Sequence, residues 1–184
     1  MIKINMGCGK RNFGKDWIHI DEANFDHIDH NNIFDFPYEN VELIYASHLI
    51  IYFDLENLNK LLTYWKSKLI KGGILRLGVP DFEKISFLYK NGWDLDYFIG
   101  PLYGKMNCND NIIFHKICFD KKSLTTVLLK NGFKNVRPWD HKLVDHGNFD
   151  DHSQAYLPHM DKKNGILISL NLECEKLKLS LCSF

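Results

Sequence analysis

The stretch that most constrains the fold lies at the N-terminus, where residues 2–9 read IKINMGCG and residues 17–21 read WIHID. An alternating apolar run that ends in Gly-x-Gly predicts a buried strand followed by a tight turn. The second run predicts another strand that ends in one carboxylate, Asp21. Open α/β sheets bind nucleotide-like ligands at the carboxyl ends of their strands, where an acid can hold a ribose diol. The two segments therefore predict a cofactor site.

The connection between these two strands restricts the kind of cofactor. Only residues 10–17 separate Gly9 from Ile18, whereas a normal helical crossover needs about a dozen residues. Asn12 stands where the dinucleotide fingerprint has its third glycine. NAD is therefore disfavoured, and a cofactor without phosphates, whose carboxylate or amino group lies against glycine backbone, fits better. A lone Gly-x-Gly is equally often only a turn, so both interpretations stay open here.

Strand-like and helix-like segments alternate along the rest of the chain, which is typical of an α/β architecture. Strands are expected at 32–36, 41–47, 74–79, 133–139 and 166–174, and helices at 55–69 and 121–131. The sequence Lys71-Gly72-Gly73 is expected to end the first helix. Residues 81–116 are aromatic and irregular and predict an inserted helical lid within one domain of 184 residues, and 140–161 is expected to be a loop.

The overall charge argues against a nucleic-acid or membrane partner. Lys+Arg and Asp+Glu both number 23, so the chain has no net basic field for nucleic acid or an anionic membrane. The five cysteines form no Cys-x-x-Cys pair, which favours free thiols in the cytoplasm. No signal segment and no membrane-spanning run is expected. The histidines and acids of 140–159 match no compact metal-ligand spacing, so no metal is expected.

Further candidate residues end predicted strands or follow the lid: Asp35, Ser47, His48, Asp81 and His115. Asp35 and Asp21 lie at neighbouring strand ends, where one can take a ribose diol and the other can approach an adenine edge. Histidine transfers protons well near neutral pH. Each residue also has a structural interpretation. The aspartates can be solvated turn residues or helix caps, and the histidines can be packing or hinge residues.

Taken in order, the segments resemble the class I S-adenosylmethionine-dependent methyltransferases, above all a small bacterial and phage group with a shortened first crossover. The resemblance covers nearly the whole chain and rests on residues 4–10 (INMGCGK), 17–21 (WIHID), 35–38 (DFPY), 43–48 (LIYASH), 69–76 (LIKGGILR), 79–83 (VPDFE), the distal series His115-Lys116, Phe119-Asp120, Leu124 and Gly132-Phe133, and residues 168–172 (ISLNL).

The chain departs from this group at two places. Asn5 stands where motif I usually begins with an acid, so backbone positioning must serve there. After the fourth strand the group commonly shows His-x-x-Glu-His-Phe, whereas residues 48–53 read HLIIYF. The missing Glu and second His affect the proton-transfer machinery, or indicate a substrate that needs little of it.

The resemblance implies a seven-stranded, mostly parallel sheet with an antiparallel last strand, and methyl transfer from S-adenosylmethionine to a small-molecule hydroxyl or amine. His48 or His115 would act as the base, with Asp81 in reserve. The implied cofactor-binding residues are Asn5, Gly7, Cys8, Gly9, Asp21, Asp35, Phe36 and Ser47. The alternative is a non-catalytic module that binds S-adenosylmethionine or a nucleotide.

Overall fold

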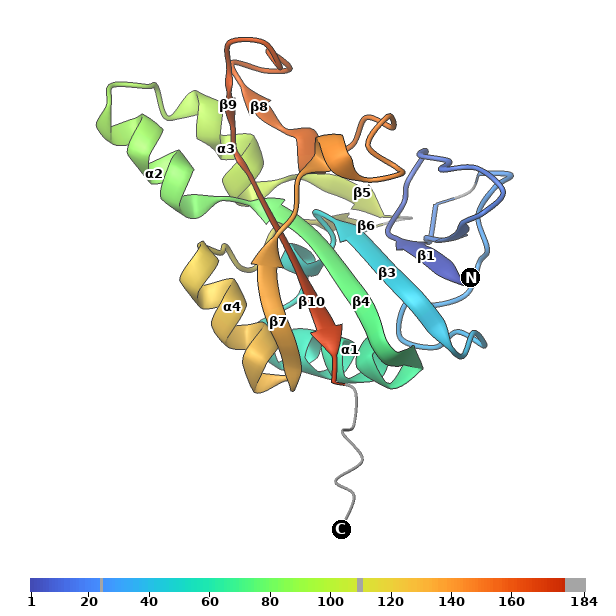
Figure 1. The fold of residues 1–184 in the computed structure, drawn as a ribbon. Coiled ribbons are helices and arrows are strands. Elements are labelled where there is room, and N and C mark those ends of the chain that lie inside the picture. The colour runs from blue at the N-terminus through green and yellow to red at the C-terminus, as the bar shows by residue number, and fades with distance from the viewer. Residues whose placement is uncertain (24, 109–110, 178–184) are drawn as a thin grey trace.

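The computed structural model describes residues 1–23, 25–108 and 111–177. Its main sheet has six strands in the order β2-β1-β3-β4-β10-β7 (Figure 1). Their bounds are Lys3–Met6 (β1), Ile18–Ile20 (β2), Val41–Ser47 (β3), Leu69–Pro80 (β4), Phe133–Pro138 (β7) and Ser169–Lys176 (β10). β1 pairs in parallel with β2 and β3, and β3 with β4, while β10 is antiparallel to both of its neighbours. The predicted α/β class, with a mostly parallel sheet and an antiparallel last strand, is confirmed.

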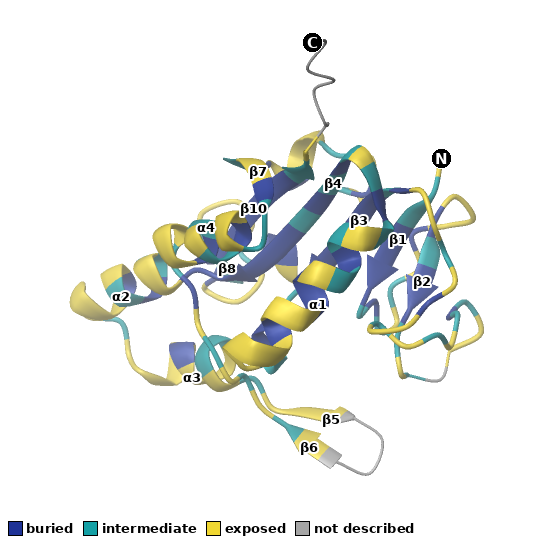
Figure 2. Ribbon diagram, turned by 90° about the horizontal axis from the view of Figure 1, so that it is seen from below, coloured by how far each residue is buried: buried dark blue, intermediate teal, exposed yellow. Residues whose placement is uncertain are grey.

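Two helices cover one face of this sheet, α1 (Leu55–Lys68) and α4 (Lys121–Lys130). The buried side chains of α1 recur at helical spacing, and those of both helices join the main hydrophobic core with Ile4, Ile44, Leu75 and Leu172 from the strands. Each helix begins at an aspartate, Asp54 or Asp120, whose carboxylate accepts a backbone N–H of the first turn. Figure 2 shows both helices in front of the buried strands.

The opposite face of the sheet is covered by irregular chain. Phe13 and Trp17 of the segment before β2 pack with Leu43, Tyr45 and Trp139 in a second cluster. The segment after β7 adds two short 3-10 helices, η2 (His141–Leu143) and η3 (His152–Gln154). This face is where the N-terminal segment and the segment after β7, far apart in the sequence, meet over the strands.

Residues 81–116 contain helices α2 (Phe82–Lys90) and α3 (Asp96–Tyr103), followed by a hairpin of β5 (Met106–Cys108) and β6 (Asn111–Ile113). Ile85, Leu88 and Phe98 pack with Leu157 and Ile168 in a third cluster. Leu157 lies in a second small hairpin, β8 (Tyr156–Leu157) with β9 (Ile166–Leu167). The segment 81–116 thus contains helices, and its hairpin β5–β6 is an addition that the sequence did not predict. The expected strand 166–174 divides into β9 and β10.

The expected strand at 32–36 does not form, which is why the sheet has six strands and not seven. Its backbone makes a turn instead: Asp35 N donates to Asn32 O at 2.9 Å, and the Tyr64 hydroxyl takes both backbone polar groups of Phe36. The chain touches β2 earlier, through a single parallel bridge between Ile20 and Asp29. At Phe36 the backbone therefore bonds to a side-chain hydroxyl and not to a neighbouring strand.

The expected end of the first helix at Lys71-Gly72-Gly73 is also wrong. α1 ends at Lys68, and Leu69 is already extended, buried and paired with Val41 of β3. The pairing register shifts just after this point, and Gly72 has a φ of 80°. The glycine therefore serves a bulge at the start of β4 and not a helix end. No helix in the described part of the chain has the length and apolar character needed to cross a membrane.

Candidate functional site

The turn after β1 contains two glycines with left-handed backbone, Gly7 (φ +65°) and Gly9 (φ +54°), a conformation that other residues adopt at a cost. Their surroundings differ. A Cβ on Gly7 would lie 2.9 Å from Leu49 Cδ1, whereas a Cβ on Gly9 would meet only Arg11 Nη1, at 4.0 Å. Gly7 therefore packs against the protein, and Gly9 presents its backbone to open space that a ligand can enter.

Asp21 lies beside this turn, as the sequence predicts. Its Oδ2 accepts a hydrogen bond from Gly9 N at 2.7 Å, and its Oδ1 accepts one from Ala23 N at 2.8 Å. A carboxylate has about four lone-pair positions, so both oxygens keep capacity for further donors such as ribose hydroxyls. These two backbone bonds hold the half-buried carboxylate in one orientation and join the turn after β1 to the chain after β2.

Three buried polar atoms near the carboxyl ends of β1 and β3 have no hydrogen-bond partner: Asn5 Nδ2, Ser47 Oγ and His48 Nε2. Asn5 pairs with Tyr45 across the two strands, and Ser47 lies two residues further along β3, so these side chains share one face of the sheet. An unsatisfied buried donor costs about 1–3 kcal/mol. Such atoms are satisfied by water, by an ion or by a polar ligand, and their position at the carboxyl ends of the strands makes this edge a candidate binding site.

His48 and His115, the two predicted bases, come close to a third histidine. The ring of His48 stacks on that of His152, with centroids 5.0 Å apart and planes at 22°. His115 packs edge-on against Tyr52 of the 3-10 helix η1 (Ile50–Tyr52), and its Nδ1 lies 3.1 Å from Pro101 O. His152 belongs to residues 140–161, which the sequence predicts to be a loop, and no residue spacing there distinguishes it from the neighbouring histidines.

Burial keeps these histidines neutral. It lowers the pKa of His48 well below the usual 6.5, and the positive charge that His152, His115 and Arg11 carry or can take up lowers it further. Burial lowers the pKa of His115 as well; at His152, whose outer side is exposed, the covered inner side of the ring and then Arg11 lower the pKa. A neutral imidazole keeps one nitrogen lone pair that can accept a proton, and the lowered pKa makes it a weaker base than a free histidine.

Asp81 serves as the N-cap of α2. Its Oδ1 accepts the backbone N–H of Glu83 at 3.2 Å, and its Oδ2 lies 3.9 Å from Lys84 Nζ. Burial raises the pKa of this carboxyl, and Lys84 partly opposes the shift. The geometry shows Asp81 as a helix cap, which was its structural interpretation from the sequence. A catalytic role for Asp81 stays a prediction.

The remaining predicted cofactor residues differ in what they can offer. The Cys8 side chain is buried, and burial raises the pKa of its thiol to about 12, so only its backbone is available. The Phe36 ring belongs to the main core and packs edge-on against Tyr64. Asp35 has an exposed side chain. The structure therefore brings Asn5, the glycines, Asp21, Ser47 and His48 together, and leaves Asp35 and Phe36 at its margin.

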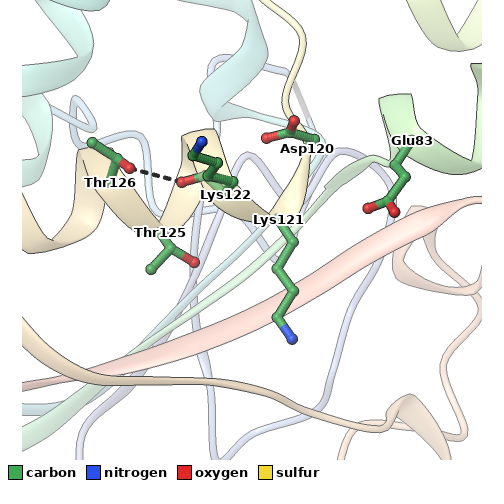
Figure 3. A pocket seen from close by; sticks show the side chains of 6 residues that line it. All are labelled: Glu83, Asp120, Lys121, Lys122, Thr125 and Thr126. Atoms are coloured by element: carbon green, nitrogen blue, oxygen red, sulfur yellow. Dashed lines mark hydrogen bonds between the residues drawn. The ribbon is translucent and has the colours of Figure 1, made fainter.

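A shallow cavity of about 450 Å³ lies elsewhere, at the start of α4 (Figure 3). It is open to solvent and contains no predicted site residue; its lining is Glu83, Asp120, Lys121, Lys122, Thr125 and Thr126. Within the described residues, no three His, Cys, Asp or Glu side chains are grouped so that they could hold a metal ion. The candidate site is thus the edge of the sheet around Gly9.

Comparison with known proteins identifies the fold. No protein-family model and no curated protein sequence matches the chain. Among solved structures, a SAM-dependent methyltransferase from Methanosarcina mazei is 13% identical over 96% of this chain and 92% of its own, with a TM-score of 0.55. One from Archaeoglobus fulgidus is 15% identical over 95% and 86%, with a TM-score of 0.53.

A third match, 1,6-didemethyltoxoflavin-N1-methyltransferase from Burkholderia thailandensis, is 9% identical over 96% of this chain and 71% of its own, with a TM-score of 0.55. That structure contains bound 1,6-didemethyltoxoflavin and S-adenosylhomocysteine. At these low identities the matches show that the backbone folds are similar, and they say nothing about the side chains of the sites. This chain therefore has the Rossmann-like fold of the S-adenosylmethionine-dependent methyltransferases.

Proposed function

We propose that this protein is a cytoplasmic methyltransferase that uses S-adenosylmethionine and modifies a hydroxyl or amine of a small molecule. The observation that carries the proposal is the turn after β1, where the open backbone of Gly9 is hydrogen-bonded to Asp21 beside the unpartnered Asn5 and Ser47. The fold supports it, because the carboxyl edge of such a sheet binds nucleotide-like ligands.

The residues at this edge fit the cofactor part by part. The backbone of Cys8 and Gly9, with the carbonyl of Gly7 and the amide of Asn5, would hold the amino-acid end, and Asp21 would hold the ribose hydroxyls. Ser47 offers a further unpartnered hydroxyl, and the backbone of Asp35 and Phe36 would border the adenine. When bound, S-adenosylmethionine supplies a methyl group on a positively charged sulfur.

The protein must then align the acceptor and exclude water, because methyl transfer is an in-line displacement. Residues 81–116 would act as the lid that does this. A hydroxyl acceptor must also lose a proton, and His48, whose Nε2 has no partner within the protein, is our first candidate to take it, with His115 as the second. The toxoflavin methyltransferase, whose structure contains 1,6-didemethyltoxoflavin, supports a small-molecule acceptor.

Calorimetric titration with S-adenosylmethionine, S-adenosylhomocysteine and NAD tests the cofactor. We expect both sulfur cofactors to bind and NAD not to bind. Asp21→Asn keeps the side-chain shape but removes the charge, and we expect it to weaken binding by about tenfold or more. Asp26→Asn, at an exposed acid nearby, is the matched control. If neither sulfur cofactor binds the unaltered protein, the proposal is wrong.

Turnover separates an enzyme from a non-catalytic binding module. The measurement is the formation of S-adenosylhomocysteine in the presence of small hydroxyl and amine acceptors. Acceptor-dependent formation that His48→Ala or His115→Ala abolishes supports the enzyme. Tight cofactor binding without turnover on any acceptor, together with unchanged binding in both variants, favours the module.

A further inference from the structure

A segment from the far end of the chain, residues 150–154, lies over the carboxyl end of β3. It contains η3, and its residue His152 stacks on His48. His152 lies in the region after β7, and nothing in the proposed function so far uses it. Its outer side is open to solvent, while Nε2 of His48 is shielded. His152 therefore covers the ring that we propose as the base.

Three hydrogen bonds fix this segment in place, and a glycine beneath it leaves the room that it needs. The Tyr45 hydroxyl of β3 donates to Asp151 Oδ2, and Arg11 Nε donates to Asp150 O at 3.0 Å. Asn171 Nδ2 of β10 donates to Ser153 O at 2.9 Å. Gly78 permits the close approach, because a Cβ there would lie 3.3 Å from Ser153 Cβ. The backbone on both sides of His152 is thus held by hydrogen bonds to the rest of the protein.

His48 is itself held in an unusual conformation. Its φ is +52°, in the left-handed region, and its backbone N–H donates to Gly78 O at 2.8 Å. Residues other than glycine occupy this region at a cost and persist there where the surroundings determine it. The backbone bond to β4 holds the main chain of His48, and the ring of His152 packs against its imidazole.

The charged and titratable groups around the pair favour the neutral form of His48. His152, His115 and Arg11 act on His48, and Arg11, His115, Asp150 and Asp151 act on His152. Protonating both stacked rings would place two positive charges about 5 Å apart. Arg11 adds a smaller effect in the same direction at His48.

We propose that His152 is a positioning residue for His48: its ring covers and orients the His48 imidazole and holds it as a neutral proton acceptor with Nε2 free. This inference rests on the proposed function, in which His48 serves the acceptor. The second histidine that the motif after β3 lacks would then be supplied from a segment about a hundred residues away in sequence.

The test is an NMR titration of histidine rings in the full chain. The samples are the unaltered protein, His152→Ala, His152→Phe and the exposed-site control His159→Ala, with His48→Gln used to assign the His48 signal. We expect His48 to titrate at higher pH in His152→Ala, which removes both the cover and the repelling charge. His152→Phe, which keeps a flat ring, should shift it less, and His159→Ala should not shift it.

Ring-to-ring contacts in the same spectra report position. They should join residues 48 and 152 in the unaltered protein and in His152→Phe. A His48 signal with the same titration in all four proteins that retain His48 would overturn the inference, as would the absence of contacts between the two rings. The surface position of His152 makes folding of both variants straightforward to verify by thermal unfolding.

Cofactor titration keeps this inference separate from the proposed function. We expect S-adenosylmethionine to bind His152→Ala and His152→Phe within about twofold of the unaltered protein. Unchanged cofactor binding with an unchanged His48 titration overturns the positioning role alone. Failure of the unaltered protein to bind the cofactor overturns the proposed function, whatever the histidines do.

Discussion

Gly7 and Gly9 share a left-handed backbone but have different reasons to be glycine. Leu49 leaves no room for a side chain at Gly7, so that position is demanded by packing. A Cβ at Gly9 would meet only an Arg11 atom 4.0 Å away, so glycine is needed there for the left-handed turn and for a ligand that contacts the backbone. The two residues therefore allow folding and ligand binding to be tested separately.

Gly9→Ala should weaken cofactor binding more than it weakens the fold. The left-handed backbone costs a non-glycine residue about 1–2 kcal/mol, and the added methyl group enters the space assigned to the ligand. We expect a similar loss of unfolding free energy in Gly14→Ala, which has a φ of +90° and no atom within 4 Å of a Cβ.

The measurement for this pair is urea denaturation together with calorimetric titration of S-adenosylmethionine. Only Gly9→Ala should lose affinity, by at least tenfold. Equal affinity in the two variants would mean that no ligand lies against Gly9.

At the residue scale, the sequence could reveal what depends on near neighbours. Gly7, Gly9 and Asp21 were predictable because a turn and the strand after it lie within one short stretch. His152 was not, because its partner His48 is about a hundred positions away and no periodicity connects them. Asp81 shows a third case, in which a residue type fits two roles and only the hydrogen bonds to Glu83 and Lys84 reveal capping.

At the scale of elements, the sheet carries a continuous row of polar residues on its loop-covered face. The strand register aligns them as neighbours from β2 to β7: His19, Asn5, Tyr45, Arg76, Glu173 and Arg137. Paired residues share a face of a sheet. Polar residues that alternate with apolar ones would suggest a solvated face, and here the segments 10–17 and 139–155 bury most of that face instead.

Glu173→Gln should destabilise the fold strongly. Glu173 of β10 pairs with Arg76 Nε at 3.0 Å and with Arg137 Nη2 at 2.8 Å, and its side chain is only 10% exposed. The change leaves Arg76 without a charge partner, while Arg137 keeps Glu175, and breaking a fully buried pair costs about 3–5 kcal/mol as an upper value. Urea denaturation measures the loss.

Glu56→Gln is the control for this change. Its pair with Lys60 on α1 is exposed, with side-chain exposures of 80% and 64%, and such a pair contributes about 0.5 kcal/mol or less. Comparable losses in the two variants would contradict a structural role for the buried network.

The elements that sequence patterns placed wrongly share one physical cause. Residues 32–36 look like a strand, yet the Tyr64 hydroxyl satisfies the backbone of Phe36 and the chain turns. Lys71-Gly72-Gly73 looks like a helix end, yet Leu69 is already drawn into the sheet beside Val41. In both cases a partner outside the local window decided the outcome.

At the scale of the whole molecule, the buried histidines make stability depend on pH. Burial lowers the pKa of His19 to about 4, and burial with Arg76 lowers that of His146 to about 4. His19 Nε2 accepts the backbone N–H of Phe13 at 2.8 Å, which requires the unprotonated nitrogen. Both groups have a pKa near 6.5 in the unfolded chain, so protons favour unfolding.

The stability that these histidines contribute is complete above about pH 6.5 and is lost as the pH falls toward about 4. Each contributes at most about 1.4 kcal/mol per pH unit in that window, less where the ring is partly hydrated. Urea midpoints measured between pH 7 and pH 4.5 should fall accordingly. In His19→Gln, whose amide oxygen can accept the Phe13 N–H, the urea midpoint should fall less steeply with pH than in the unaltered protein. In His159→Gln it should fall as steeply as in the unaltered protein. Identical pH dependence in His19→Gln and the unaltered protein would refute the assignment.

The loop-covered face has a consequence for how the chain folds. Lys3 and Arg11 hold the segment after β7 through contacts that span 142 and 139 positions of sequence. Contacts of such separation slow folding, because chain entropy is lost before they form. During synthesis β1, β2 and β3 emerge long before the residues that cover them. The segment that covers the loop-covered face, and then β10, which lies between β4 and β7, are therefore added after β1, β2 and β3 have formed.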